Sequence, residues 1–542
     1  MRTRAAVSVI GVRDSLAPKQ NMVEEDLPEE NVGRRTALKY IGAGVAGLAI
    51  GGVAGWGLAP PKIVTETVTQ TVTKTLTEIA TATATPLEEF GPGIDYYWDP
   101  KLKGTEINYL AAALPEKPPV FKYIPLFEQE TGIKVNKTVL SETDVFTKAS
   151  TAFAAKSAEF DMVDAGWYGA AAYSYWKSGF IDPIENFLPI TPKGWKADDF
   201  LDAPKNACTA FPEDGSKWLV MPICSTVCMG TWHNTNLLQG SGLPLPLAGT
   251  TDIGGDYTRG KPVTWAEFEA GIDKIHKPPQ VIGFANFLLP PVLAFYGWQP
   301  FVWSFNTNFI HKDFTPNFDD PEVIAATELF LKMTKYVPDP GTYDWATMMS
   351  QASTGKLASF FTCATDQSDI FAEGSKVTPE IMRWAWAPRE KTSALMAAGS
   401  TPCISSFSKK KEAAWAFYSW IQSPRMQQLF LQEGNSPTRK STIENPANKQ
   451  AKDWFIQTNL QSDQWLAQAK PVGTPGADLV YSIITPKMPR SIELVVAAGT
   501  EIGKIYSKEL SVKEAMSNAQ AAAEKILKEI DFYGKKTYEF GV

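Results

Sequence analysis

The fold of this chain is constrained most by an alternation of strand-like and helix-like segments. Apolar, strand-like runs cover 104–112, 133–140 and 160–167, and amphipathic stretches lie between them, one ending at Gly132 and the other around 146–158. This βαβαβ order predicts an α/β protein with a parallel sheet. Because such sheets bind ligands in the loops at the carboxyl ends of their strands, we expect the functional site there.

Two later helices extend this pattern. The segment 409–421 has a helical pattern that stops before the Ser423-Pro424 pair. The clearest helix begins with a capping box formed by Ser511 and Glu514. We interpret its apolar face as core packing rather than as a partner surface; the face comprises Ala515, Ala519, Ala522, Ala523, Ile526, Leu527 and Ile530.

Composition and motif content argue against several functions. The 542 residues include 52 basic and 59 acidic side chains, a net charge of −7, which argues against a nucleic acid as partner. With only three histidines, a multi-histidine metal site or a His-based triad is not expected, and neither is a cofactor. No Walker motif occurs, so ATP hydrolysis is not expected of this chain.

The five cysteines, an odd number, leave at least one thiol unpaired. Cys224 and Cys228 lie in one extended, apolar run. Four residues of a straight strand separate them by about 13 Å, too far for a disulfide. The sequence therefore predicts that these two do not pair with each other.

The first 61 residues have the character of an export signal. The segment GRRTALK at 33–39 resembles a twin-arginine signal, although its first and fifth residues depart from the usual Ser/Thr and Phe. A charge-free apolar stretch follows over 40–61 and has a length that suits a bilayer span. Cleavage after Ala59 would leave Pro60 at the new amino terminus, so both a removed signal and a retained anchor stay open.

A Thr-rich, low-complexity run covers 64–85. Its composition is typical of an extended stalk rather than of a strand in a sheet. We therefore divide the chain into a signal or anchor over 1–61, a stalk over 62–90 and a folded domain over 91–542. The stalk would hold that domain above the membrane.

A series of segments in the folded domain occurs in a recognisable order. They include IPLFEQETGIKV at 124–135, SAEFDMVDAGWYGAAAYSYWKSGFIDPIENFL at 157–188, KPVTWAEFEAGIDKI at 261–275 and EGNSPTRKS at 433–441. Over about 104–531 the chain resembles the extracellular solute-binding proteins of family 1, the sugar-type receptors of ABC importers. The resemblance implies a periplasmic-binding-protein-like fold of type II, in which two α/β lobes close on a ligand in the cleft between them.

The resemblance also implies the division of the lobes and the function. Lobe 1 would take about 104–222 and 400–434, and lobe 2 about 223–399 and 435–542. The hinge candidates are the extended runs 221–230 and 396–405. The implied function is that of a non-enzymatic extracytoplasmic receptor that captures a sugar or oligosaccharide and delivers it to the permease subunits of an ABC importer. It would be tethered to the outer face of the cytoplasmic membrane, or secreted if the signal is cleaved.

Sugar sites combine flat aromatic rings with polar groups that bind hydroxyls. Residues of these types near strand ends and hinges are our candidates: Glu142, Asp144, Trp167, Tyr168, Trp232, Trp298, Trp303, Asp366, Trp386, Gly399 and Ser400. Plainer roles stay open for many of them: packing for the tryptophans, a helix N-cap for Asp144 and a solvated turn for Asp366. Only one of Trp298 and Trp303 is expected to reach the ligand. Arg439 and Lys440 are expected to be surface charges.

Other functions stay open at this point. One alternative is a receptor for a peptide or a polyol phosphate, although the acidic balance disfavours a phosphate ester. Another is a secreted glycoside hydrolase, which needs two carboxylates flanking a scissile bond. Acidic pairs such as Asp161 with Asp164 occur, but nothing marks them as catalytic.

Overall fold

The computed structural model describes residues 99–114, 116–167, 169, 171–210, 213–224, 226–244, 262–451, 453–483 and 486–535. The chain divides into two compact units, Met1–Leu87 and Glu88–Val542, and the described residues belong to the second. The predicted export signal, the apolar stretch and the Thr-rich stalk lie outside the described residues.

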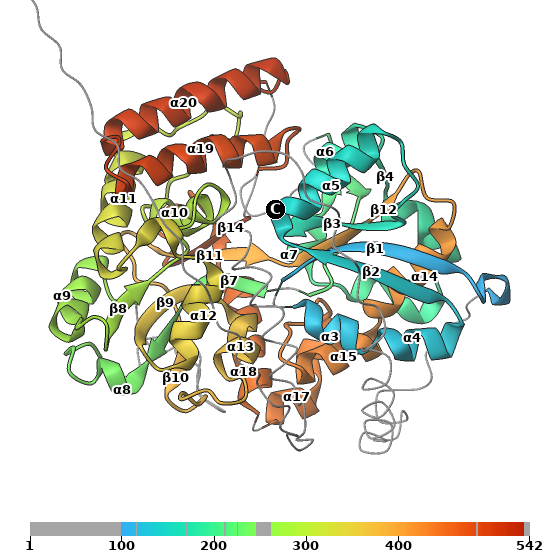
Figure 1. Ribbon diagram of the computed structural model, residues 1–542, viewed down its shortest axis with the longest axis horizontal. Coiled ribbons are helices and arrows are strands. Elements are labelled where there is room, and N and C mark those ends of the chain that lie inside the picture. The colour runs from blue at the N-terminus through green and yellow to red at the C-terminus, as the bar shows by residue number, and fades with distance from the viewer. Residues whose placement is uncertain are drawn as a thin grey trace, which may run out of the picture. The chain divides into compact units, whose positions relative to one another are not determined.

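The first sheet contains the βαβαβ unit. Its strand order is β2 (Lys134–Leu140), β1 (Glu106–Ala112), β3 (Met162–Trp167), β12 (Ser400–Ser405) and β4 (Ile181–Asp182) (Figure 1). β1 pairs in parallel with both β2 and β3, as the sequence predicts. β12 returns from a distant part of the chain and runs antiparallel to β3. We call this sheet and its helices lobe 1.

The helices of lobe 1 follow the predicted pattern with one difference. The first amphipathic stretch forms two helices rather than one, α3 (Lys117–Lys122) and α4 (Ile124–Thr131), and Gly132 ends the second with a positive φ of 70°. α5 (Glu142–Ala154) begins at the N-cap Ser141. The remaining helices of lobe 1 are α6 (Ala172–Lys177), α14 (Lys411–Ile421) and α15 (Pro424–Gln432).

The second sheet is larger and is built from the middle and the end of the described chain. Its order is β13 (Lys470–Pro471), β14 (Leu479–Ile483), β11 (Ser393–Ala398), β7 (Thr226–Asn234), β9 (Leu357–Cys363) and β8 (Ile282–Ala285), with β10 (Met382–Ala385) also paired to β7. We call this sheet and its helices lobe 2. The two lobes stand side by side in Figure 1. The predicted α/β class is confirmed.

The helices of lobe 2 pack around this sheet. They are α8 (Thr235–Leu238), α9 (Trp265–Ile275), α10 (Val292–Ser304), α11 (Pro321–Met333), α12 (Trp345–Ser353), α13 (Gln367–Ile370), α18 (Trp454–Gln468), α19 (Ser491–Tyr506) and α20 (Val512–Glu529). The predicted capping box of Ser511 and Glu514 is present at the start of α20. None of the helices in the described part of the chain is both long enough and apolar enough to cross a membrane.

Short elements complete the description. They are α7 (Asp202–Ala207), α16 (Lys440–Glu444), α17 (Pro446–Gln450), the strand pair β5 (Thr209–Ala210) and β6 (Asp214–Trp218), and the 3-10 turns η2 (Pro100–Leu102), η3 (Ile184–Ile190), η4 (Lys193–Trp195), η5 (Ala197–Asp199), η6 (Thr334–Tyr336), η7 (Pro340–Thr342) and η8 (Ala364–Asp366).

The chain crosses between the sheets where the hinge candidates lie. β11 of lobe 2 and β12 of lobe 1 are separated only by Gly399. The second crossing segment lies against the first, because the Ile223 amide donates to the Ser400 carbonyl at 2.7 Å. The backbone thus places Ser400 and Gly399 at the junction of the lobes.

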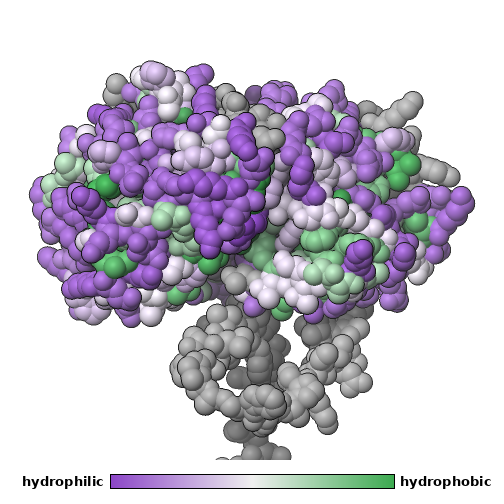
Figure 2. All heavy atoms as spheres, turned by 90° about the horizontal axis from the view of Figure 1, so that it is seen from above, coloured by the Kyte–Doolittle hydropathy of each residue, from purple (hydrophilic) through white to green (hydrophobic). Residues whose placement is uncertain are grey.

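Figure 2 shows the molecule from the side on which α19, α20, α5 and α6 lie. This face is mostly hydrophilic, with scattered apolar groups.

Arg439 corrects one sequence prediction. It is fully buried rather than a surface charge. Its guanidinium donates to the Gln422 carbonyl at 2.6 Å and pairs with Asp199 at 3.2 Å. Lys440, in contrast, lies at the surface and pairs with Asp202.

Candidate functional site

A buried ion pair lies at the amino-terminal half of β3. Asp164 lies in β3 and its Oδ1 accepts from Lys117 Nζ at 2.7 Å and from the Tyr109 hydroxyl at 2.6 Å. Its Oδ2 accepts from the Ala112 amide at 2.6 Å. Lys117 also donates to Tyr109, and all three side chains are buried. Both oxygens of this carboxylate therefore have hydrogen-bond donors within the protein, so the ion pair has a structural role.

Two glutamates beside this pair each have a carboxyl oxygen without a hydrogen-bond partner among the described residues. Glu116 immediately precedes α3 and is 2% exposed, and its Oε1 has no hydrogen-bond partner among the described residues. Burial raises the pKa of Glu116 to about 7. Glu142 is the first residue of α5, and its Oε1 is also buried without a partner among the described residues. Burial, followed by the charges of Glu116 and Asp164, raises the pKa of Glu142 to about 8.

Glu142 is partly exposed as a residue, whereas its carboxyl group is fully enclosed. The carboxyl therefore faces inward, where an ordinary first-turn glutamate of a helix would face water.

Lobe 2 contributes a third carboxyl group. Asp463 lies on α18, is 6% exposed, and both of its oxygens lack a partner among the described residues. Burial raises its pKa well above the ordinary value. The charges of both Glu116 and Asp463 raise the pKa of the Cys224 thiol, so this thiol lies between one carboxyl of each lobe. We call Glu116 and Glu142 the carboxyl cluster.

Two further groups lie at this cluster. Tyr296 on α10 of lobe 2 is close enough to Glu142 that the Glu142 charge, after burial, raises the pKa of the Tyr296 hydroxyl. Ser400 is fully buried, and its Oγ has no partner among the described residues. The Ser400 backbone lies close enough to the Glu116 carboxyl to lower its pKa. Ser400 also pairs by register with Trp167, the last residue of β3.

The structure therefore brings together Glu142, Gly399, Ser400 and the end of β3 from the predicted set. Tyr168 lies outside the described residues. Trp386 is partly buried, contacts Trp465 of α18 edge to face at 5.8 Å, and has an Nε1 without a partner among the described residues. The contact places Trp386 beside α18.

The other predicted residues lie elsewhere. Asp144 is exposed and accepts from the Ser141 hydroxyl at 2.6 Å; the N-cap of α5 is Ser141, so the alternative role for Asp144 as N-cap is wrong. Trp298 is fully buried within lobe 2, stacked on Phe318, and donates to Thr327 at 2.8 Å. Trp303 is also fully buried there. Both rings have the environment of core residues.

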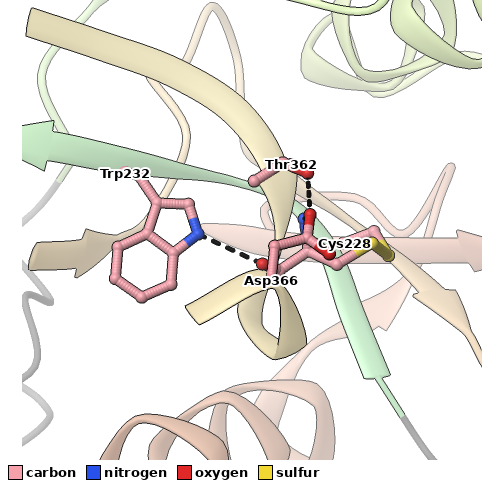
Figure 3. The surroundings of a disulfide bond; sticks show 5 residues. Cys228, Trp232, Thr362 and Asp366 are labelled. Atoms are coloured by element: carbon pink, nitrogen blue, oxygen red, sulfur yellow. Dashed lines mark hydrogen bonds between the residues drawn. A yellow bond between two sulfur atoms is a disulfide. The ribbon is translucent and has the colours of Figure 1, made fainter. Parts of the chain in front are cut away.

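Trp232 and Asp366 surround a disulfide (Figure 3). Cys228 of β7 is bonded to Cys363 of β9, and Trp232 Nε1 donates to the Cys363 carbonyl at 3.1 Å. Asp366 is fully buried and accepts from the Cys363 amide and the Thr362 hydroxyl. It is not the solvated turn that was the alternative for it. Through these contacts Trp232 and Asp366 stabilise the end of β9 next to the disulfide.

The remaining cysteines agree with the sequence prediction. Cys208, Cys224 and Cys403 are unpaired and buried, so Cys224 and Cys228 are not bonded to each other. No group of three or more potential metal-binding side chains occurs among the described residues.

Sequence reasoning missed Glu116, Asp463 and Tyr296. Glu116 precedes two prolines and Asp463 lies mid-helix, and neither context distinguishes them from solvated charges. The sequence did contain a signal for Asp164. A charged residue inside an apolar strand is rarely buried without a partner, so its position predicts an ion pair.

Comparison with known proteins settles the family. Residues 103–428, more than half of the chain, match the model of the bacterial extracellular solute-binding proteins. The chain belongs to this family. As an extracellular solute-binding protein it is a receptor rather than an enzyme, and it acts outside the cytoplasm. The hydrolase alternative is thereby set aside.

Curated relatives of this solute-binding protein are distant. The mannitol-binding protein of Pseudomonas aeruginosa is 23% identical over 420 residues, which are 73% of this chain and 86% of that protein. A probable amino-acid ABC transporter periplasmic-binding protein of Sinorhizobium fredii is 22% identical over 326 residues, 59% of this chain and 69% of that protein.

Solved structures support the same fold. A solute-binding protein of Agrobacterium radiobacter in complex with ribitol has a TM-score of 0.65 and 18% identity, covering 78% of this chain and 99% of its own. One of Agrobacterium vitis with bound D-mannitol also has a TM-score of 0.65, with 20% identity, covering 79% of this chain and 99% of its own. The likeness confirms the predicted two-lobed periplasmic-binding-protein fold.

Proposed function

We propose that this receptor captures a sugar or polyol between its lobes and delivers it to the permease of an ABC importer. The observation that carries the proposal is a set of neighbouring buried polar atoms that have no hydrogen-bond partner among the described residues, beside Tyr296 of lobe 2: Glu116 Oε1, Glu142 Oε1 and Ser400 Oγ. Buried polar atoms without partners cost about 1–3 kcal/mol each, so native proteins rarely keep them without a ligand or water.

A polyhydroxylated ligand suits these atoms. Each hydroxyl can donate to a carboxylate and accept from a protonated carboxyl or a serine hydroxyl at the same time. Tyr296, whose hydroxyl is acted on by the Glu142 charge, offers a flat apolar surface against which a sugar ring can pack. In this proposal Trp167, Tyr168 and Trp386 of the predicted set add further such surfaces. The relatives support this ligand class, since they include proteins that bind mannitol and ribitol.

The placement of the site suggests how capture is signalled. Glu116 and Glu142 belong to lobe 1, whereas Tyr296 belongs to lobe 2. A ligand that binds groups of both lobes stabilises the closed arrangement relative to the open one. In our proposal the crossing segments around Gly399 are the hinge, and the closed, loaded form is the one that docks on the permease.

The amino-terminal residues complete the proposal. Their Arg-Arg motif and apolar stretch support export by the twin-arginine route followed by retention as a membrane tether, with the Thr-rich run as a stalk. A receptor for a peptide or another non-sugar solute remains the second candidate, because one relative carries the name of an amino-acid transporter component.

Thermal unfolding of the purified protein tests the ligand class. The panel consists of monosaccharides, oligosaccharides, alditols, peptides and polyol phosphates. A compound that binds only the native state stabilises it by about 2.7 kcal/mol at one hundred times its dissociation constant. A shift with sugars or alditols, and without product on long incubation, supports the proposal. A shift with peptides or phosphates alone overturns the ligand class but not the family.

A further inference from the structure

The carboxyl-terminal part of lobe 2 contacts lobe 1 directly at two places away from the carboxyl cluster. One contact is polar and comes from the segment between β14 and α19. The other is aromatic and comes from the chain that follows α20. In Figure 1 the red helices α19 and α20 lie on the same side of the molecule as α5 and α6 of lobe 1. Both contacts therefore join the lobes without a ligand between them.

The polar contact involves α7 and the strand pair β5 and β6, which pack with lobe 1. The ring of Trp218 in β6 lies 6.0 Å from the ring of Trp195, centroid to centroid. Trp195 Nε1 in turn donates to the Ser419 carbonyl in α14 at 3.0 Å. Because α14 packs on β12 of the first sheet, these short elements move with lobe 1.

Lys487 of lobe 2 makes the polar contact with these elements. Its Nζ donates to the carbonyl oxygen of Asn206 in α7 at 2.6 Å, and the Thr209 hydroxyl of β5 lies 3.5 Å from the same nitrogen. The lysine is only 7% exposed. A buried ammonium group is costly unless it is hydrogen-bonded, and these acceptors belong to the other lobe. Separation of the lobes therefore breaks this hydrogen bond.

Phe532 makes the aromatic contact. Beyond the end of α20, Asp531 has a positive φ of 61°, and the Phe532 amide donates back to the Leu527 carbonyl at 3.0 Å. The Phe532 ring lies 5.0 Å from the Phe314 ring of lobe 2 and 6.4 Å from the Tyr173 ring of α6 in lobe 1, centroid to centroid. Phe532 is 3% exposed. Opening the lobes exposes apolar surface of this ring, which favours closure.

These contacts and the carboxyl cluster act on closure in opposite directions. A hydrogen bond from a charged donor and a buried aromatic pair both favour the closed arrangement. The partnerless oxygens of the cluster oppose it while the site is empty. The balance between the two sets the fraction of closed protein before any ligand binds. The apparent affinity for a ligand of the closed form scales with that fraction.

We propose that Lys487 and Phe532 form a clasp, with Asn206 and Tyr173 as their partners, that holds the two lobes together independently of ligand. The inference concerns the movement of the lobes and goes beyond the proposed function, since it does not depend on the ligand class. Lys487 and Phe532 are positioning residues, because they act on affinity only through the fraction of closed protein. Loss of the clasp should therefore weaken all ligands by the same factor.

Distances between spin labels on the two lobes test the clasp in the ligand-free full chain. Thr151→Cys on α5 and Ser517→Cys on α20 provide one exposed labelling position on each lobe. The described free cysteines are buried, so the labels attach at the introduced thiols. Lys487→Met and Phe532→Ala should each shift the distance distribution toward separated lobes. For Lys487→Met the ratio of closed to open protein should fall about tenfold.

Matched controls separate the clasp from general damage. Lys513→Met removes an exposed lysine of α20, and Phe309→Ala truncates a buried phenylalanine whose ring contacts lie within lobe 2. Both should leave the distance distribution as in the wild type. Far-ultraviolet circular dichroism establishes that each variant is folded before labelling. If Phe532→Ala does not fold, Lys487→Met decides the test alone.

Calorimetry with D-mannitol and ribitol provides a second readout. Each clasp variant should weaken both compounds by the same factor, up to about tenfold, so that the ratio of the two affinities stays constant. Unchanged distances in the folded clasp variants overturn the clasp and leave the proposed receptor standing. A loss of affinity for one polyol alone indicates a ligand contact and also overturns the clasp. If no sugar or polyol binds, the proposed function falls, and the distances still decide the clasp.

Discussion

The stability of the ligand-free protein should decrease as the pH rises from about 5 to about 8. Glu116 illustrates the reason: burial raises its pKa from 4.5 to about 7, so the folded protein holds a proton that the unfolded chain has lost over this range. A group whose pKa is raised on folding favours the folded state while it is protonated. That contribution is largest below pH 4.5 and disappears as the pH passes through the folded value near 7.

The magnitude follows from linkage. One pKa unit corresponds to about 1.4 kcal/mol, so ionising Glu116 in the closed, ligand-free protein opposes folding by about 3 kcal/mol. Part of this effect is already present at pH 5, which leaves a loss of about 2–3 kcal/mol between pH 5 and pH 8. Other buried carboxyls, among them Glu142 and Asp366, have raised pKa values and act in the same direction.

Urea unfolding of the wild type and of Glu116→Gln isolates the contribution of this residue. The variant carries no titrating group at position 116. Between pH 5 and pH 8 its free energy of unfolding should therefore fall by about 2–3 kcal/mol less than that of the wild type. Glu373→Gln, an exposed control, should follow the wild type. Parallel curves for the wild type and Glu116→Gln would refute the assignment of a raised pKa to Glu116.

Three further predictions concern the surroundings of the site. Lys117→Met should destabilise the protein by about 3–5 kcal/mol, since it leaves Asp164 buried without its counter-charge, and adding Asp164→Asn should recover part of this loss in urea unfolding. Cys228→Ser should cost about 2–5 kcal/mol in thermal unfolding, because it opens a disulfide whose cysteines are 135 residues apart, while reducing agent should destabilise the wild type and not the variant. Trp298→Phe should lower stability through loss of its buried hydrogen bond and leave ligand affinity unchanged in calorimetry; a large loss of affinity would return this ring to the binding site.

Local patterns predicted the fold well. The strands β1, β2 and β3 and the helix α20 follow from periodicity and capping residues that act within a few positions of one another. The sequence predicted one amphipathic stretch where the structure has two helices, α3 and α4, separated by a single residue. Such local errors do not change the topology.

The site was harder to predict because its contacts are long-range. Arg439 was taken for a surface charge, but its burial depends on Asp199 and Gln422, one of which is 240 residues away. The pairing of Cys228 with Cys363 depends on the alignment of β7 with β9 and has no local signal. Glu116 and Asp463 likewise become neighbours of Cys224 only after the chain has crossed between the lobes.

Hydrogen-bond satisfaction separates structural carboxyls from those available to a ligand. Asp164 has donors at both oxygens, all of them from lobe 1, so movement of the lobes leaves this carboxyl unchanged. In our proposal the carboxyl cluster differs, because opening of the lobes returns Glu142 to water and removes the cost of its burial. Closure without ligand is therefore opposed by these groups and closure around a ligand that satisfies them is not. This difference between the empty and the loaded protein is what a receptor needs if only its loaded form is to reach the transporter.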